Sequence, residues 1–109
     1  MRYTVSSSDG SGTYTVTVAG DVGTVRMKCT CAAGENGTYC KHRINLIDGD
    51  YRAVLAGDVS ALAVLKEWLP GSTLEAALAE KRAADKALDD AKKRVKQATL
   101  SVSKALLTG

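Results

Sequence analysis

The sequence contains no long apolar stretch, and this absence limits where the chain can work. No run of residues has the length and apolarity of a signal peptide or of a membrane-spanning helix. We therefore expect a protein that is neither secreted nor bound to a membrane, and that works in the cytoplasm, the nucleoid or the nucleus, where thiols stay reduced. The formal net charge of +3 over 109 residues is too small to identify a partner by itself.

Catalytic motifs are also missing. The chain has a single histidine, His42, and it has neither a nucleophile elbow nor a glycine loop that could cradle phosphate. The adjacent carboxylates Asp89 and Asp90 fall in a segment predicted to be helical, where the side chains of neighbouring residues diverge. We therefore expect that the protein is not an enzyme.

The first fifty residues have few large aliphatic side chains, so their core must be thin. A unit of this size buries only about 60% of its unfolded surface and needs an additional stabilising link. The same segment holds all the cysteines and the histidine, as Cys29, Cys31, Cys40 and His42. Three thiolates and one imidazole predict a closed, four-coordinate site for one structural Zn²⁺ per chain. The alternatives are a disulfide with one free thiol, and buried or redox-active thiols.

Residues 1–31 show the alternation of strands, with turns at residues 6–12 and 20–23. Cys29 and Cys31 would share one face of the last strand. Cys40 and His42 have the same spacing, which on a helix would separate them by ~200°, so we expect them in the turn that leads into a helix. The inward positions of the sheet would be Tyr3, Val5, Tyr14, Val16, Val18, Val25, Met27, Cys29 and Cys31.

The segments 25–31 (Val-Arg-Met-Lys-Cys-Thr-Cys) and 39–42 (Tyr-Cys-Lys-His) resemble the SWIM-type zinc finger, whose pattern is Cys-x-Cys, a variable gap and Cys-x-His. The resemblance implies a small β-β-α zinc module that binds DNA or protein. Its ligands would be Cys29, Cys31, Cys40 and His42. Family members usually have a longer apolar helix after the last ligand pair than this chain offers, because residues 48–50 (Asp-Gly-Asp) follow closely.

Residues 50–70 should form a short helical hairpin. Asp50 would cap a first helix that runs to Leu55, and Asp58 would cap a second helix that stops at Pro70. The second helix would carry one apolar stripe, formed by Val59, Leu62, Leu65 and Leu69.

A long helix should follow. Residues 72–75 (Ser-Thr-Leu-Glu) form a capping box, and no glycine or proline interrupts the chain before Thr108. We therefore predict an α+β fold with a zinc-stabilised antiparallel β-sheet module at residues 1–49, short helices at 50–70 and a coiled-coil-like helix at 72–108. At ~1.5 Å per residue this helix is about 50 Å long, so it needs a partner.

The long helix would carry an alanine seam, a heptad stripe in which alanine occupies every second core position. Small residues permit close approach of a second helix, and the charges favour an antiparallel homodimer with its two-fold axis near Leu88. The alternatives are that the helix folds back on residues 58–69, or that it binds a helix of another protein. The predicted interface consists of Leu74, Ala77, Leu78, Ala84, Leu88, Ala91, Val95, Ala98, Val102 and Ala105.

Basic residues alternate with the ligands and predict a phosphate-binding face. Our first hypothesis is a module that binds nucleic acid, DNA in preference to RNA, through Arg26, Lys28, Lys41 and Arg43, with Tyr39 stacking on a base or sugar. The alternative is a protein-interaction adaptor, in which the zinc site is purely structural, the cations only balance its charge and the long helix docks a protein partner. A thiol switch that releases zinc on oxidation is a third hypothesis.

Overall fold

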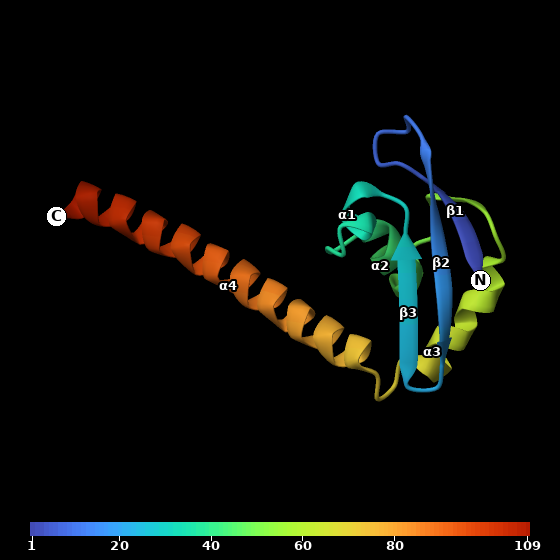
Figure 1. Ribbon diagram of the computed structural model, residues 1–109. Helices are drawn as coiled ribbons and strands as arrows, with labels where there is room; N and C mark the ends of the chain where they lie inside the picture. Colours follow the sequence, from blue (N-terminus) through green and yellow to red (C-terminus); the bar gives the residue numbers. More distant parts are fainter. The chain divides into compact units, whose positions relative to one another are not determined.

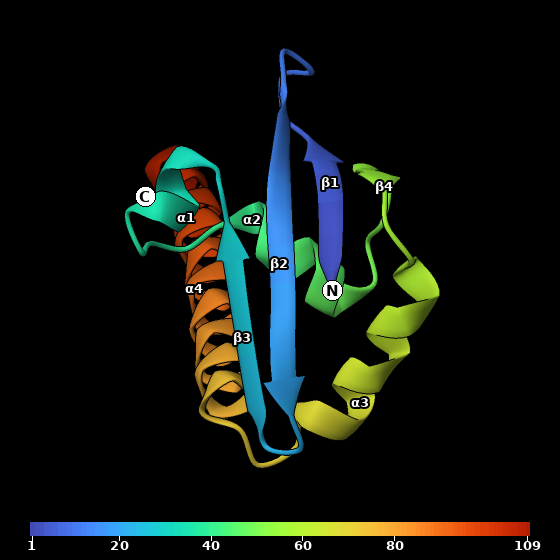
Figure 2. The same cartoon turned by 45° about the vertical axis from the view of Figure 1, so that its right-hand side comes forward.

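Four antiparallel strands form one sheet in the order β3-β2-β1-β4, as a computed structural model of residues 1–109 shows (Figures 1 and 2). The chain divides into two compact units, residues 1–74 and 75–109. The strands are β1 (Arg2–Ser6), β2 (Thr13–Asp21), β3 (Thr24–Cys29) and β4 (Val54–Ala56). The helices are α1 (Ala32–Glu35), α2 (Lys41–Asp48), the 3-10 helix η1 (Val59–Val64), α3 (Leu65–Trp68) and α4 (Thr73–Thr108). The predicted α+β class is thus confirmed.

The strands form where apolar and polar residues alternate, as predicted. Tyr3 pairs with Val16, and Val18 pairs with Met27, so the apolar side chains of neighbouring strands lie on one face. A two-residue turn joins β2 to β3, and Gly23 occupies its left-handed position with φ 79°. In Figure 2 helix α2 lies behind the sheet, on its apolar face.

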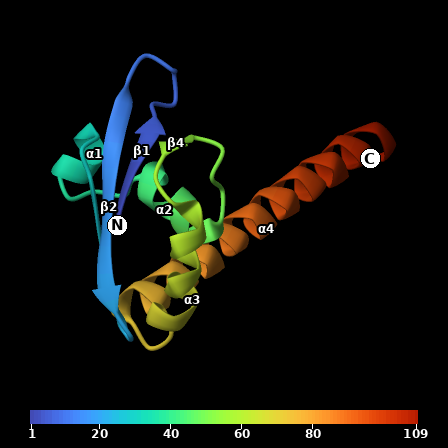
Figure 3. The ribbon, with the colours of Figure 1, turned by 90° about the vertical axis from the view of Figure 1, so that its right-hand side faces the viewer.

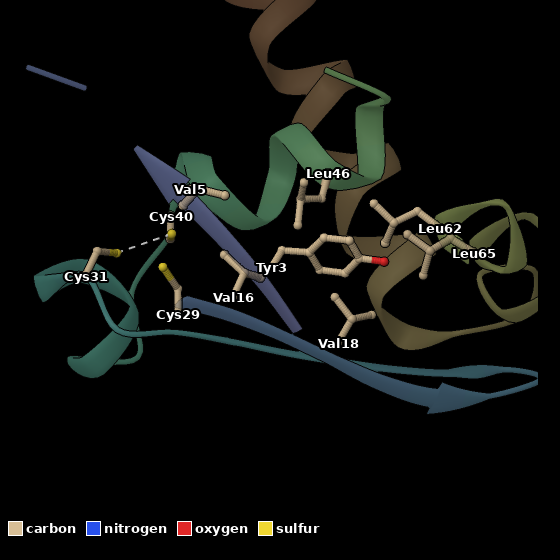
Figure 4. Close-up of a cluster of buried hydrophobic side chains, with 10 residues drawn as sticks. All are labelled: Tyr3, Val5, Val16, Val18, Cys29, Cys31, Cys40, Leu46, Leu62 and Leu65. Atoms are coloured by element: carbon tan, nitrogen blue, oxygen red, sulfur yellow. Dashed lines mark hydrogen bonds between the residues drawn. The ribbon is translucent and has the colours of Figure 1, made fainter. Parts of the chain in front are cut away.

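The core of the first unit lies between this face and the short helices (Figure 4). Tyr3 is its largest side chain, and its hydroxyl donates a hydrogen bond of 2.7 Å to the carbonyl oxygen of Asp58. Leu62 and Leu65 of η1 and α3 are buried, so the predicted apolar stripe packs on the sheet. The buried members of the core are Tyr3, Val5, Val16, Val18, Cys29, Cys31, Cys40, Leu46, Leu62 and Leu65.

The predicted helix over residues 50–55 is wrong, because this segment completes the sheet. The backbone N–H of Ser6 donates to the carbonyl of Ala53 at 2.9 Å, and β4 pairs with β1 through Val5 and Val54. The free edge of β1 offers hydrogen bonds over a long sequence distance, and these override the local helix signal. Only one helical segment, η1 followed by α3, remains of the predicted hairpin.

Capping residues set the ends of the helical segments. The carboxylate of Asp58 accepts from the N–H of Ser60 at 3.0 Å and caps η1, as predicted. Figure 3 shows η1 and α3 running as one segment beside the strands. Helix α4 begins at Thr73 and ends at Thr108, which confirms the predicted long helix. None of the helices combines the length and the apolar character needed to cross a lipid bilayer.

A matched pair of glycine substitutions should measure how closely the chain after β4 approaches β1. Gly57 has φ 118°, and a Cβ built there would lie 2.6 Å from Cδ1 of Tyr3, whereas Gly10 has φ 74° and nothing within 4 Å. We expect Gly10→Ala to lower the free energy of unfolding by about 1 kcal/mol and Gly57→Ala by about 2 kcal/mol more. Urea unfolding followed by Trp68 fluorescence would measure both, and equal losses would contradict this packing.

Candidate metal centre

The four predicted ligands come from the ends of three elements. Cys29 is the last residue of β3, Cys31 is the N-cap of α1, Cys40 is the N-cap of α2, and His42 lies in the first turn of α2. The expectation that Cys40 and His42 lead into a helix is confirmed. The expectation that Cys31 belongs to the strand is wrong, because β3 ends at Cys29.

A local contact explains why the strand ends there. The Cys31 sulfur accepts the N–H of Gly34 at 3.2 Å and caps α1. Gly34 lies so close to the end of β3 that a Cβ at this position would be 2.4 Å from the carbonyl oxygen of Cys29. Glycine therefore lets α1 fold back tightly, and this turns the Cys31 thiol toward Cys29.

The four side chains converge on one point. Their ligand atoms all lie within 4.8 Å of one another. The Sγ atoms of Cys31 and Cys40 are 3.4 Å apart, and His42 Nδ1 lies 3.5 Å from Sγ of Cys40 and 3.7 Å from Sγ of Cys29. Metal–sulfur bonds of about 2.3 Å in a tetrahedron place sulfurs about 3.8 Å apart. The spacing therefore fits a tetrahedral metal site, while all three thiols are free of disulfides.

His42 is oriented for coordination through Nδ1. This nitrogen faces the sulfurs, whereas Nε2 is buried and has no hydrogen-bond partner. The ring contacts Tyr14, with a centroid distance of 5.0 Å and an interplanar angle of 48°. Coordination through Nδ1 requires the tautomer with its proton on Nε2. A metal-bound histidine usually donates this outer N–H to a hydrogen-bond acceptor, and His42 has no such acceptor here.

The surroundings of two of the thiols shift their pKa values in opposite directions. Desolvation raises the pKa of Cys29 to about 12. Desolvation also opposes ionisation of Cys40, but the backbone N–H of Arg43 donates to its sulfur, and hydrogen bonds with the Cys31, His42 and Cys29 side chains add to this, so that the pKa of Cys40 falls to about 6. Packed thiols cannot all ionise beside one another without a compensating cation.

A thiolate-rich, four-ligand set suits zinc and leaves no position for a substrate. The residues therefore fit a structural zinc ion. All four side chains come from this chain, and three of them are buried.

The predicted nucleic-acid contacts are divided between two places, because Arg26, Lys28 and Arg43 line one groove and Lys41 lies elsewhere. Arg26 and Lys28 are exposed on the sheet face opposite the metal ligands, as expected from their alternation with Met27 and Cys29. Lys41 instead lines a separate polar cavity beside the β1–β2 loop. The guanidinium of Arg43 donates to the carbonyls of Met27 at 3.3 Å and Thr38 at 2.5 Å, and Tyr39 is 53% exposed.

Sequence reasoning missed Arg2. Register pairs Arg2 with Thr17 and Thr17 with Lys28, so the two cations lie on one row across the sheet. The signal was present, because Arg2 precedes the inward Tyr3 and must point the other way.

The predicted dimer interface lies on α4, with two distinct ends. Leu74 lines a groove of the first unit, and Leu78 is the buried residue of the helix. The later members are open to solvent: Leu88, Val95 and Val102 are 56%, 67% and 59% exposed. Ala91 and Ala98 form a shallow hollow with Arg94 and Val95.

Comparison with protein families finds one match. The SWIM zinc finger family matches residues 14–46, a range that contains all four ligands. This segment is therefore a SWIM zinc finger with a structural metal site, which confirms the resemblance of its Cys-x-Cys and Cys-x-His pairs. No curated protein and no solved structure matches the chain.

Removal of the metal should unfold the first unit and spare the long helix. Only the first unit depends on the ligands, and zinc sites of this kind contribute about 10–16 kcal/mol. We expect a chelator, or Cys29→Ser or His42→Ala, to abolish the near-ultraviolet dichroism while most far-ultraviolet helical signal from α4 persists. Lys41→Ala, an exposed change between two ligands, is the control and should retain one zinc per chain.

Zinc affinity should rise with pH. In the metal-free protein, whose first unit is unfolded, thiols have the ordinary cysteine pKa of about 8.5, so they are mainly protonated at neutral pH and must lose protons to bind the metal. Stability from the metal is therefore present at neutral pH and lost as the pH falls. Competition with a chelator of known proton affinity should give at least a tenfold gain per pH unit, roughly one proton per zinc. An affinity independent of pH between 6 and 8 would be incompatible with thiol ligands.

Proposed function

We propose that this SWIM zinc finger is a nucleic-acid-binding module, not an enzyme, and that its long helix joins two copies. The observation that carries the proposal is the outer face of the sheet, which no helix covers in Figure 2. This face presents three cations, Arg2, Arg26 and Lys28, and one carboxylate, Asp21, at its end. The metal ligand Cys29 ends β3, the strand that carries Arg26 and Lys28.

The register supports a phosphate-binding surface. Arg2 and Lys28 flank Thr17, and Arg26 pairs with Ala19, so small side chains separate the cations. Adjacent strands lie about 4.8 Å apart, which places the backbones of Arg2 and Lys28 roughly 10 Å from one another. A nearly flat surface with cations at this spacing can follow a phosphodiester backbone, with threonine hydroxyls as further donors.

The chemistry favours backbone contacts over base recognition. Alternation turns the aromatic side chains of the strands, Tyr3 and Tyr14, toward the other face. Stacking on bases is therefore left to Tyr39, next to the metal ligand Cys40. We propose DNA as the nucleic acid, bound mainly through phosphates and hence with little sequence preference.

The exposed apolar residues of α4 support an antiparallel homodimer. A stripe through Leu88, Val95 and Val102 stays in solvent unless it finds a partner. The two leucines that a folded-back helix would need, Leu62 and Leu65, are already buried in the core of the first unit. Dimerisation would double the number of phosphates contacted.

Salt dependence tests the DNA-binding face. Three cations per chain predict a slope of log affinity against log salt of about −2.7 for one copy bound to duplex DNA. Arg2→Ala and Lys28→Ala should each reduce this slope by about 1, whereas Lys66→Ala, which makes the same charge change on α3, should leave it unchanged. Fluorescence anisotropy of the zinc-loaded protein measures all three variants. Equal effects of Arg2→Ala and Lys66→Ala would mean that the face is not the binding site.

Light scattering tests the dimer. We expect twice the 11.4 kDa mass of one chain. Leu88→Asp would place carboxylates of both copies beside the two-fold axis and should dissociate the dimer, whereas Gln97→Asp on the opposite side of the helix should not. A monomeric unsubstituted protein would rule out this assembly.

A further inference from the structure

A groove of about 370 Å³ runs beside the outer strand of the sheet. Its volume is within the range of about 300–1,000 Å³ that is typical of ligand sites. The groove lies between β3 and α2, at the edge of the sheet. It is lined by Val25, Arg26, Met27, Lys28, Arg43, Ile44, Ile47 and Leu74.

The floor of the groove is apolar. Val25, Met27 and Ile47 are partly buried and pack against the core, and Ile44 lies one turn before Ile47 on α2. These side chains come from a strand and a helix that the metal ligands at their ends hold together. The floor therefore exists in the absence of a partner and can accept apolar side chains without folding first.

The charged residues at the rim of the groove are all positive. Arg26, Lys28 and Arg43 line it, and no carboxylate does. The guanidinium of Arg43 is fixed by its hydrogen bonds to the carbonyls of Met27 and Thr38. An occupant must therefore combine apolar side chains with carboxylates.

The edge of β3 is closed to a further strand. The outward carbonyl of Met27 accepts from Arg43, and the carbonyl of Cys29 lies against the backbone of Gly34 in α1. An added strand would need these carbonyls for its own hydrogen bonds. The groove consequently suits a helix, which brings side chains and needs no backbone pairing.

We propose that this groove binds an amphipathic helix of a partner protein, one that carries carboxylates next to its apolar anchors. The anchors lie on Met27, Ile44 and Ile47, and the carboxylates pair with Arg26, Lys28 and Arg43. The site does not rest on nucleic-acid binding, since its floor is apolar, and it shares only Arg26 and Lys28 with the proposed DNA-binding face.

Labelled helical peptides test the groove with the full-length, zinc-loaded protein. The first peptide has leucines on one face and glutamates beside them, the second replaces the glutamates with lysines, and the third replaces the leucines with alanines. We expect the first to bind at least about tenfold more tightly than either other peptide, because only it satisfies both the floor and the rim.

Variants separate this site from the DNA-binding face. Ile44→Ser should weaken the first peptide about tenfold and leave DNA affinity unchanged, and Arg2→Ala should do the reverse. The Lys28→Glu variant should no longer bind the glutamate peptide more tightly than the lysine peptide, whereas the Lys66→Glu variant should still do so. Zinc content and Trp68 fluorescence verify that each variant is folded.

Three outcomes would overturn the proposal: equal binding of all peptides, a preference for the lysine peptide, or peptide binding insensitive to both Ile44→Ser and Lys28→Glu. If Ile44→Ser weakens duplex DNA binding as strongly as it weakens binding of the first peptide, the groove is a nucleic-acid site instead.

Discussion

The fold depends on packing three thiols and one imidazole within 4.8 Å of one another. Burial alone opposes this arrangement once the thiols ionise, since desolvation already holds the pKa of Cys29 at about 12. A divalent cation bound between the thiolates replaces their mutual repulsion with attraction to the metal, so that the close packing of the four ligands becomes stable. Because the ligands sit at the ends of β3, α1 and α2, the same contact fixes how the strand meets both helices.

The surfaces follow from that arrangement. The first unit has seven basic and seven acidic side chains in residues 1–74, so its net charge does not favour any partner. The distribution of the charges does favour a partner, because alternation along the strands places Arg2, Arg26 and Lys28 together on the outer face of the sheet. The same alternation turns Val25 and Met27 inward, where α2 leaves them half-covered and a groove forms. One strand, β3, thus contributes a ligand, a basic face and an apolar floor.

Local patterns were sufficient to predict much of this structure. The spacing of Cys29, Cys31, Cys40 and His42 identified the metal site, and the absence of glycine and proline after Thr73 identified α4. Strand β4 could not be predicted, because three residues are too few to show an alternation, and the strand with which it pairs, β1, lies about fifty residues earlier in the sequence. The contact of Gly34 with Cys29, which places Cys31 on a helix cap, is likewise a tertiary contact. Lys41 and Arg26 are both basic residues close to metal ligands in the sequence. Their different positions in the structure, Lys41 beside a separate cavity and Arg26 on the outer face of β3, depend on how α2 packs on the sheet.

X-ray absorption at the zinc edge tests the central claim most directly, because it counts the ligand atoms around the metal. The account predicts three sulfurs at about 2.3 Å and one nitrogen at about 2.0 Å, with no oxygen ligand. Two or fewer sulfurs, or a coordinated water, would contradict the closed site and with it the structural role of the metal.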